Sequence, residues 1–255
     1  MSEKRKSKFL SEAELQTLQS YVKSQADLAR EKGTTRAIVD EVIVLLLARV
    51  GLRANELRSL TIKDLPKNNG DKVLKIRNTE GKVLRTVDIS EDIAQLLSRF
   101  VRLYRKGAAK TDTLLENERG NPFGYMSLYN KVRRIGEQAG IGKITPAILQ
   151  HTYLVRLYEK EQDLRYVQEQ TGYLSRRTLA KYLINGRSRR VTLKRGSAEL
   201  NTQESAEQKS RHIESERICE ACGTQCVVSR GRRIESGQFL CQKCLEYFRT
   251  DSFED

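Results

Sequence analysis

The sequence has no apolar segment long enough to cross a bilayer and no recognisable signal peptide. Its most apolar run, "VIVLLLARVGL" from Val42, follows Asp40 and Glu41 directly and falls well short of the roughly 20 apolar residues that a spanning helix needs. The basic N-terminal stretch "MSEKRKSKFL" is not followed by the apolar core of a signal peptide. We therefore expect a cytoplasmic protein with no membrane association.

Acidic residues and cysteines are also scarce. The 255 residues include 33 Asp and Glu against 47 Lys and Arg, so the net charge is +14 at pH 7. Such an excess favours a polyanionic partner such as nucleic acid. All five cysteines lie between Cys219 and Cys244, and a reducing cytoplasm makes them poor candidates for disulfides.

The patterning of the first 183 residues predicts a mainly α protein with one small antiparallel β-sheet, an α+β fold. A helix starts at Ser11, which can cap it while Glu14 closes a capping box. Residues 36–51 are apolar along one side and should form a core helix, whereas 72–90 alternate around a turn at 78–81, as a hairpin does. Further helices are predicted over 91–106, 126–140 and two amphipathic stretches within 147–183.

The composition changes after Asn185. The stretch "GRSRRVTLKRG" has five basic side chains and no acid, and the residues after it are polar with almost no apolar members, as in a flexible linker. The length allows one sizeable domain and a small module. We therefore divide the chain into a domain (1–185), a linker (186–216), a cysteine module (217–248) and an acidic tail (249–255).

Three segments of the domain resemble the tyrosine recombinase, or phage integrase, family. They are "GLRANEL", "ITPAILQHTYLVRLYE" and "DLRYVQEQTGYLSRRTLAKYL", in which Tyr182 follows Tyr173 by nine residues. The family's segments read roughly G-L-R-x-x-E-L, P-H-x-L-R-H-T-x-A-T and L-G-H, with a tyrosine nine residues later. The resemblance runs from about Phe9 to Asn185 and implies the catalytic-domain fold of these proteins.

The resemblance also implies a reaction that needs neither metal nor ATP. A tyrosine attacks a DNA phosphodiester, forms a 3′-phosphotyrosine and releases a 5′-hydroxyl, while two arginines hold the non-bridging oxygens and a lysine protonates the leaving oxygen. Fixed cationic donors stabilise the negative charge that develops on the phosphorane. By position, Tyr182 is the nucleophile, Arg53 the first arginine and Glu56 the acid that braces it; Lys82 is the best candidate for the lysine, with Lys75 as an alternative.

Three catalytic positions depart from the family pattern. The H-x-x-R motif is represented by Ala147 and Gln150, and the histidine or tryptophan of the third segment by Tyr173. Gln150 can donate only a neutral hydrogen bond, and Ala147 cannot transfer a proton. His151 is not expected to substitute, because the family commonly has a histidine at this position in addition to the catalytic one. We therefore expect a DNA-binding member of the family with impaired or lost strand cleavage, the alternative being an active recombinase that uses Tyr182.

Basic residues close to Tyr182 are the expected contacts to double-stranded DNA. Only eight residues precede the first helix, so we expect the helical core-binding domain of typical family members to be missing and binding to depend on phosphate contacts and on salt. Self-association on DNA stays open. The predicted DNA-binding residues are Arg176, Arg177, Lys181, Arg187, Arg189 and Arg190.

The cysteine module has the spacing of a four-cysteine zinc ribbon, C-x2-C-x18-C-x2-C. Each C-x2-C pair presents two thiolates to one tetrahedral ion, and so small a module needs the metal for its stability. We expect Cys226 to take no part, the alternative being a C-x3-C pairing with Cys222. We expect the basic residues of "VVSRGRRIESGQF" to lie at a hairpin tip. A further alternative is an interaction scaffold that recruits a protein partner through the ribbon. The predicted ligands of a structural Zn²⁺ are Cys219, Cys222, Cys241 and Cys244.

Overall fold

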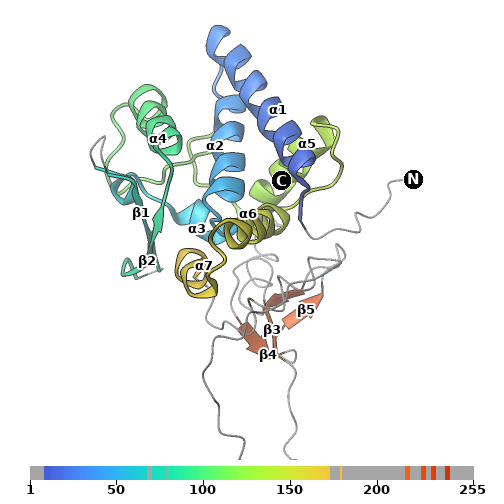
Figure 1. Ribbon diagram of the computed structural model, residues 1–255. Helices are drawn as coiled ribbons and strands as arrows, with labels where there is room; N and C mark the ends of the chain where they lie inside the picture. Colours follow the sequence, from blue (N-terminus) through green and yellow to red (C-terminus); the bar gives the residue numbers. More distant parts are fainter. Residues whose placement is uncertain are drawn as a thin grey trace, which may run out of the picture.

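A computed structural model describes residues 9–67, 71–78 and 80–172, Leu179, and the backbone of four short strands near the C-terminus (Figure 1). The prediction of a mainly helical protein with a small antiparallel sheet is confirmed. In chain order the elements of the larger part are α1 (Glu12–Glu31), α2 (Arg36–Arg49), α3 (Ala54–Ser59), the 3₁₀ helix η1 (Ile62–Asp64), β1 (Val73–Arg77), β2 (Val83–Asp88), α4 (Glu91–Tyr104), α5 (Tyr125–Gln138), α6 (Pro146–Glu161) and α7 (Leu164–Thr171).

Helix α2 is the central element, as its apolar sequence predicts. It lies beside α1 and contacts α3, α4, α5 and α6 (Figure 1). Val42, Ile43, Val44 and Leu46 are fully buried, so nearly every side of the helix faces protein. The main hydrophobic core therefore surrounds α2, and the shorter elements pack around it.

Local sequence signals set several helix ends. Ser11 accepts a hydrogen bond from the backbone N–H of Glu14, and the Glu14 carboxylate accepts one from the Ser11 N–H at 2.7 Å, so the predicted capping box is confirmed. At the start of α7, Asp163 accepts from the N–H groups of Arg165 and Tyr166. Both capped ends satisfy donors that would otherwise lack a partner.

The predicted hairpin is formed by β1 and β2, which pair antiparallel from Val73 opposite Asp88 to Arg77 opposite Val83. The turn is closed by the Gly81 N–H, which donates to the Asn78 carbonyl at 3.0 Å. Only the second strand leads directly into a helix, because α4 begins at Glu91. In the sequence the hairpin therefore lies between α3 with η1 and α4, and its first strand contacts α3 and η1.

Within the cysteine module the structure describes only strands β3 (Glu216–Ile218), β4 (Gln225–Val227), β5 (Gly231–Arg233) and β6 (Phe239–Cys241). β3 pairs with β4 and β5 with β6, both antiparallel. Arg232 and Arg233 therefore belong to a strand, opposite Leu240 and Phe239, and not to the hairpin tip that we predicted. Among the described helices of the whole chain, none is long and apolar enough to cross a membrane.

Candidate functional site

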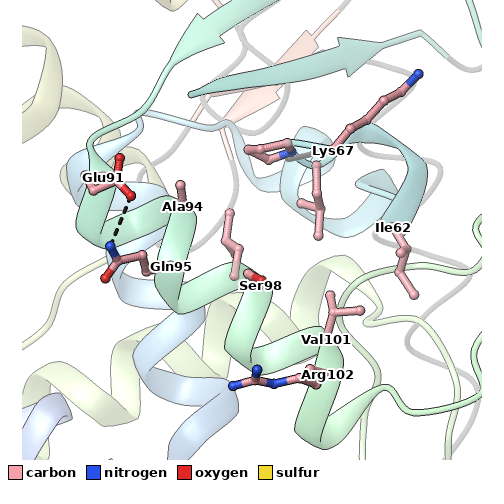
Figure 2. A pocket seen from close by; sticks show the side chains of 11 residues that line it. Ile62, Lys67, Glu91, Ala94, Gln95, Ser98, Val101 and Arg102 are labelled. Atoms are coloured by element: carbon pink, nitrogen blue, oxygen red, sulfur yellow. Dashed lines mark hydrogen bonds between the residues drawn. The ribbon is translucent and has the colours of Figure 1, made fainter. Parts of the chain in front are cut away.

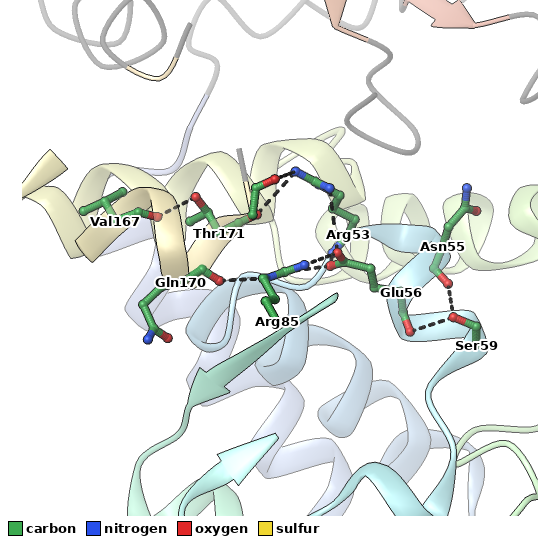
Figure 3. A network of polar contacts seen from close by, with 9 residues as sticks. Arg53, Asn55, Glu56, Ser59, Arg85, Val167, Gln170 and Thr171 are labelled. Atoms are coloured by element: carbon green, nitrogen blue, oxygen red, sulfur yellow. Dashed lines mark hydrogen bonds and ion pairs between the residues drawn. The ribbon is translucent and has the colours of Figure 1, made fainter. Parts of the chain in front are cut away.

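Arg53 lies at the N-cap position of α3, and its side chain reaches across to the end of α7. Its backbone N–H donates to Glu56 Oε2 at 2.8 Å. Its guanidinium Nη2 donates to the carbonyl oxygens of Gly172 at 2.9 Å and Thr171 at 3.3 Å (Figure 3). With 14% of the side chain exposed, Arg53 is both a link between two helices and a cation close to the surface.

Glu56 has a closer ionic partner than the one we predicted. The shortest distance between its carboxylate and the Arg53 guanidinium is 3.8 Å. Arg85, from β2, instead donates from both Nη atoms to the two carboxylate oxygens, with 3.0 Å between Nη2 and Oε2. Both side chains are about nine-tenths buried, so this is an interior pair; Glu56 braces Arg53 mainly through the backbone N–H.

The same β2 strand is bonded to α7 at two places. Arg85 Nε donates to the Gln170 carbonyl at 3.1 Å (Figure 3). The buried side-chain amide of Gln170 accepts from the Asp88 N–H at 2.9 Å and donates to Asp88 Oδ2 at 3.0 Å. The hairpin, α3 and the C-terminal end of α7 are therefore one hydrogen-bonded unit.

Helix α6 carries two of the three positions where the sequence departs from the family pattern. Ala147 is half-buried in the first turn of the helix. Gln150 is only 6% exposed, and its Nε2 has no hydrogen-bond partner among the residues that the structure describes. His151 is half-buried and makes a contact of its own. A buried amide donor left without a partner is costly, so Gln150 holds unused donor capacity.

Tyr153, also on α6, packs against the turn that leads to Arg53. A Cβ added to Gly51 would lie 2.1 Å from its ring. Burial raises the pKa of the Tyr153 phenol, the nearby Tyr166 and Asp88 raise it further, and Arg85 acts in the opposite direction. Its phenol is therefore held in the protonated form, which is a poor nucleophile.

The two candidate lysines occupy different places on the hairpin. Lys82 is exposed directly before β2, and its backbone N–H donates to Asn78 Oδ1 at 2.9 Å. Lys75 lies on β1 opposite Thr86, whereas Arg85 lies opposite Ile76. Because side chains alternate along a strand, Lys75 projects from the face opposite to the one that carries Arg85.

The remaining predicted site residues lie outside the described part of the chain. They are Tyr182, Tyr173, Arg176, Arg177, Lys181, Arg187, Arg189 and Arg190, together with the side chains of Cys219, Cys222, Cys241 and Cys244. The nearest described residue to Tyr182 is Leu179, which is fully buried in a small cluster with Leu154 and Val155 of α6 and Val167 of α7. Three positions before Tyr182, the chain is thus anchored on α6 and α7.

Sequence reasoning missed Arg85, although the strand contains a signal. Arg85 has the same alternation phase as Val87 and Ile89, both of which are buried. A charged side chain in the inward-facing phase of a strand requires a buried partner. That partner, Glu56, lies 29 residues away in the sequence, so local pattern alone does not identify it.

The hollow beside α4 contains none of the predicted site residues (Figure 2). It has a volume of about 230 Å³, with an apolar wall that includes Ile62, Ala94 and Val101 and with Lys67 and Arg102 at its sides. Within its lining, Gln95 Nε2 donates to Glu91 Oε1 at 3.0 Å. The candidate functional site is therefore the unit formed by α3, β2 and α7.

Comparison with known proteins agrees with this arrangement. Tyrosine recombinase XerA from Saccharolobus solfataricus is 30% identical over 143 residues, which are 56% of this chain and 45% of the relative. Tyrosine recombinase XerC from Staphylococcus epidermidis is 32% identical over 157 residues, 60% of this chain and 51% of the relative. The chain thus spans about half the length of these curated relatives.

Solved structures show the same fold. A crystal structure of XerA recombinase superimposes with a TM-score of 0.58 and 26% identity over 69% of this chain and 59% of that one. The XerH site-specific recombinase bound to difH substrate, a pre-cleavage complex, gives a TM-score of 0.57 and 26% identity over 69% and 49%. Residues 8–189 match the model of the phage integrase family. This chain is a member of the phage integrase family, the tyrosine recombinases.

Proposed function

We propose that this chain binds double-stranded DNA and that its strand cleavage is impaired or lost. Relatives with the same fold are named recombinases, and one of them was solved on its DNA substrate. The net charge of +14 supports a polyanionic partner. Arg53, exposed Lys82 and the basic residues around Tyr182 supply the phosphate contacts; the side of the hairpin on which Lys75 lies favours Lys82 over Lys75.

We infer the loss of cleavage mainly from Gln150, whose neutral, buried amide stands at the position of the second arginine. It can donate to a bound phosphate oxygen but adds no positive charge when the phosphorane forms. Losing one preorganised donor to a developing oxyanion costs roughly 10²–10³ in rate. Losing a general acid or base, as at Ala147, costs roughly another 10²–10⁴, although the two losses do not simply add.

Arg85, the second guanidinium of the unit formed by α3, β2 and α7, does not replace the missing arginine. Arg85 is engaged through Nε with the Gln170 carbonyl and through both Nη atoms with Glu56, and only 10% of its side chain is exposed. To reach a phosphate it would have to leave a buried carboxylate without its partner, which is strongly destabilising. The site therefore keeps a phosphate-binding arginine and lacks a second one.

We also propose that the cysteine module is a structural zinc ribbon, which follows a flexible linker in the sequence. Cys219 directly follows β3 and Cys241 ends β6, so each cysteine pair adjoins a two-stranded hairpin. Four thiolates with this spacing fit one tetrahedral Zn²⁺ that has no open position for chemistry. The domain limits 1–185, 186–216, 217–248 and 249–255 follow from this assignment.

The proposal is tested by trapping a covalent adduct between protein and DNA on a denaturing gel. A nicked duplex pool of random sequence serves as substrate, because cleavage beside the nick leaves the phosphotyrosine in place. The wild type, Tyr182→Phe and the double variant Ala147→His, Gln150→Arg are compared. We expect no adduct from the wild type and a tyrosine-dependent adduct from the double variant.

Two matched variants separate charge from geometry. Gln150→Lys adds a charge without the two-pronged guanidinium, and Gln138→Arg adds the same guanidinium elsewhere; neither is expected to form an adduct. A wild-type adduct that disappears in Tyr182→Phe would show a working strand transferase and overturn the proposed loss of cleavage.

A further inference from the structure

The C-terminal end of α7 is capped by two arginines from elsewhere in the fold. The last carbonyls of a helix have no partner within the helix. Arg85 Nε donates to the Gln170 carbonyl, and Arg53 Nη2 donates to the carbonyls of Thr171 and Gly172 (Figure 3). Cations at this end also favour the helix dipole. Two guanidiniums thus fix the point at which the chain leaves α7.

Glu56 links Arg85 to Arg53. Its carboxylate binds Arg85 through both oxygens and also accepts from the Arg53 N–H. A paired, buried side chain of this kind holds one geometry, since any rotation breaks two hydrogen bonds at once. The position of Arg53 at the surface therefore depends on an arginine that lies on another element.

Gly172 shows how closely Arg85 approaches the backbone. A Cβ at this position would lie 2.9 Å from Arg85 Nη1 and 3.1 Å from its Cδ, and the residue has φ +69°. The Arg85 side chain cannot move away without losing Glu56 or Gln170. This close contact therefore leaves little freedom to the Arg85 side chain or to the backbone at the end of α7.

We propose that Arg85 is a positioning residue for DNA binding: by holding Glu56 and the end of α7, it sets the placement of the Arg53 guanidinium. This inference rests on the proposed DNA-binding function. Arg85 touches no phosphate itself. Its loss removes the phosphate contact of Arg53, because Glu56 then no longer has the bidentate partner that holds it against the Arg53 N–H.

The test is the salt dependence of binding to a fluorescent duplex of random sequence, with the full chain. The slope of log K against log salt counts phosphate contacts, at about 0.9 per contact. Arg85→Lys keeps the charge but not the bidentate pair or the Nε donor. We expect its slope to fall by about 0.9, the equivalent of one phosphate contact, relative to the wild type.

Arg105→Lys is the matched control. Arg105 also pairs with a carboxylate through both Nη atoms, in Glu116, and also donates to a backbone carbonyl, that of Thr113, with 13% of its side chain exposed. A melting curve of each variant shows whether it is folded at the assay temperature. We expect Arg105→Lys to lower stability and leave the slope unchanged, so lost stability alone does not explain a changed slope.

A second variant covers the case in which Arg85→Lys does not fold. Glu56→Gln with Arg85→Gln removes both charges together and leaves no buried lone charge. Its slope should still be low, because the link to the Gln170 carbonyl is gone. A wild-type slope in either folded Arg85 variant overturns the inference, whereas a wild type without salt-dependent binding overturns the proposed function itself.

Discussion

At the scale of single residues, the environment of Tyr153 excludes this tyrosine as a nucleophile. Tyr153 is packed on Gly51, and burial followed by the nearby Tyr166 and Asp88 raises the pKa of its phenol. A phenol held protonated in this way does not supply the nucleophile of a strand-transfer reaction. Tyr182 stays the predicted nucleophile, a prediction that the described residues do not test.

A pH titration of stability tests the environment of Tyr153. A phenol pKa raised by folding favours the folded state fully below the unfolded value of about 10, and this contribution is lost as the pH rises through the folded pKa. We expect the free energy of unfolding of Tyr153→Phe to fall less steeply above pH 10 than that of the wild type, by at most about 1.4 kcal/mol per pH unit. Urea unfolding between pH 8 and 11, in roughly unit steps, measures it; coincident profiles would contradict it.

At the scale of elements, the turn from α2 to α3 depends on a close approach to α6. Gly51 follows α2 with φ +73°, and the ring of Tyr153 covers it so tightly that no Cβ fits. The turn sets the position of Arg53 two residues later. The packing of α2 on α6 is therefore part of what places the arginine.

Gly51→Ala should lower the free energy of unfolding by about 3 kcal/mol. The left-handed backbone costs an alanine roughly 1–2 kcal/mol, and displacing a packed ring costs a further 1–3. Gly33→Ala is the control, because Gly33 has φ +67° and nothing within 4 Å of its added Cβ. Chemical denaturation of both variants checks the difference; equal losses would mean that Tyr153 gives way without cost.

The elements themselves could be predicted from the sequence because their signals are local. The capping box of Ser11 and Glu14 spans four residues, and the hairpin closes within one turn around Asn78 and Gly81. The pairing of Arg85 with Glu56 could not be predicted in this way. Its partners are far apart in the chain, and only the folded packing of α3, β2 and α7 brings them together.

The same limit applies to the candidate site. Motif spacing identified Arg53, Glu56, Ala147 and Gln150 by position, and the structure places the first two in one network. Motif spacing could not show that Arg85 is the closer partner of Glu56. Nor could it show that the Gln150 amide is buried without a hydrogen-bond partner among the described residues. Spacing reports which residue occupies a position, and burial decides what that residue can do.

At the scale of the whole molecule, the chain combines an integrase-family domain with a cysteine-bearing module that follows it in sequence. The family match ends at residue 189, before the first of the described C-terminal strands. The described hydrogen bonds and core contacts of the domain join residues between 9 and 179. The two parts should respond separately to loss of metal.

Metal analysis tests this division. We expect one Zn²⁺ per chain, lost on chelation and in Cys241→Ser, because removing one thiolate opens the tetrahedral site. Cys226→Ser is the control and should keep its zinc. Proteolysis should then become rapid in 217–248, while the melting temperature of the domain stays the same; zinc content unchanged by Cys241→Ser would refute the ligand set.

The contact between Gly172 and Arg85 also determines which variants of this chain can persist. Every missense change at codon 172 introduces a Cβ against a guanidinium that is already held by Glu56 and Gln170. Codon 147 faces no such restriction, because Ala147 is half-buried and has ordinary helical backbone. A saturation-mutagenesis library selected for DNA binding should therefore lose nearly all substitutions at codon 172 while it keeps many at codon 147.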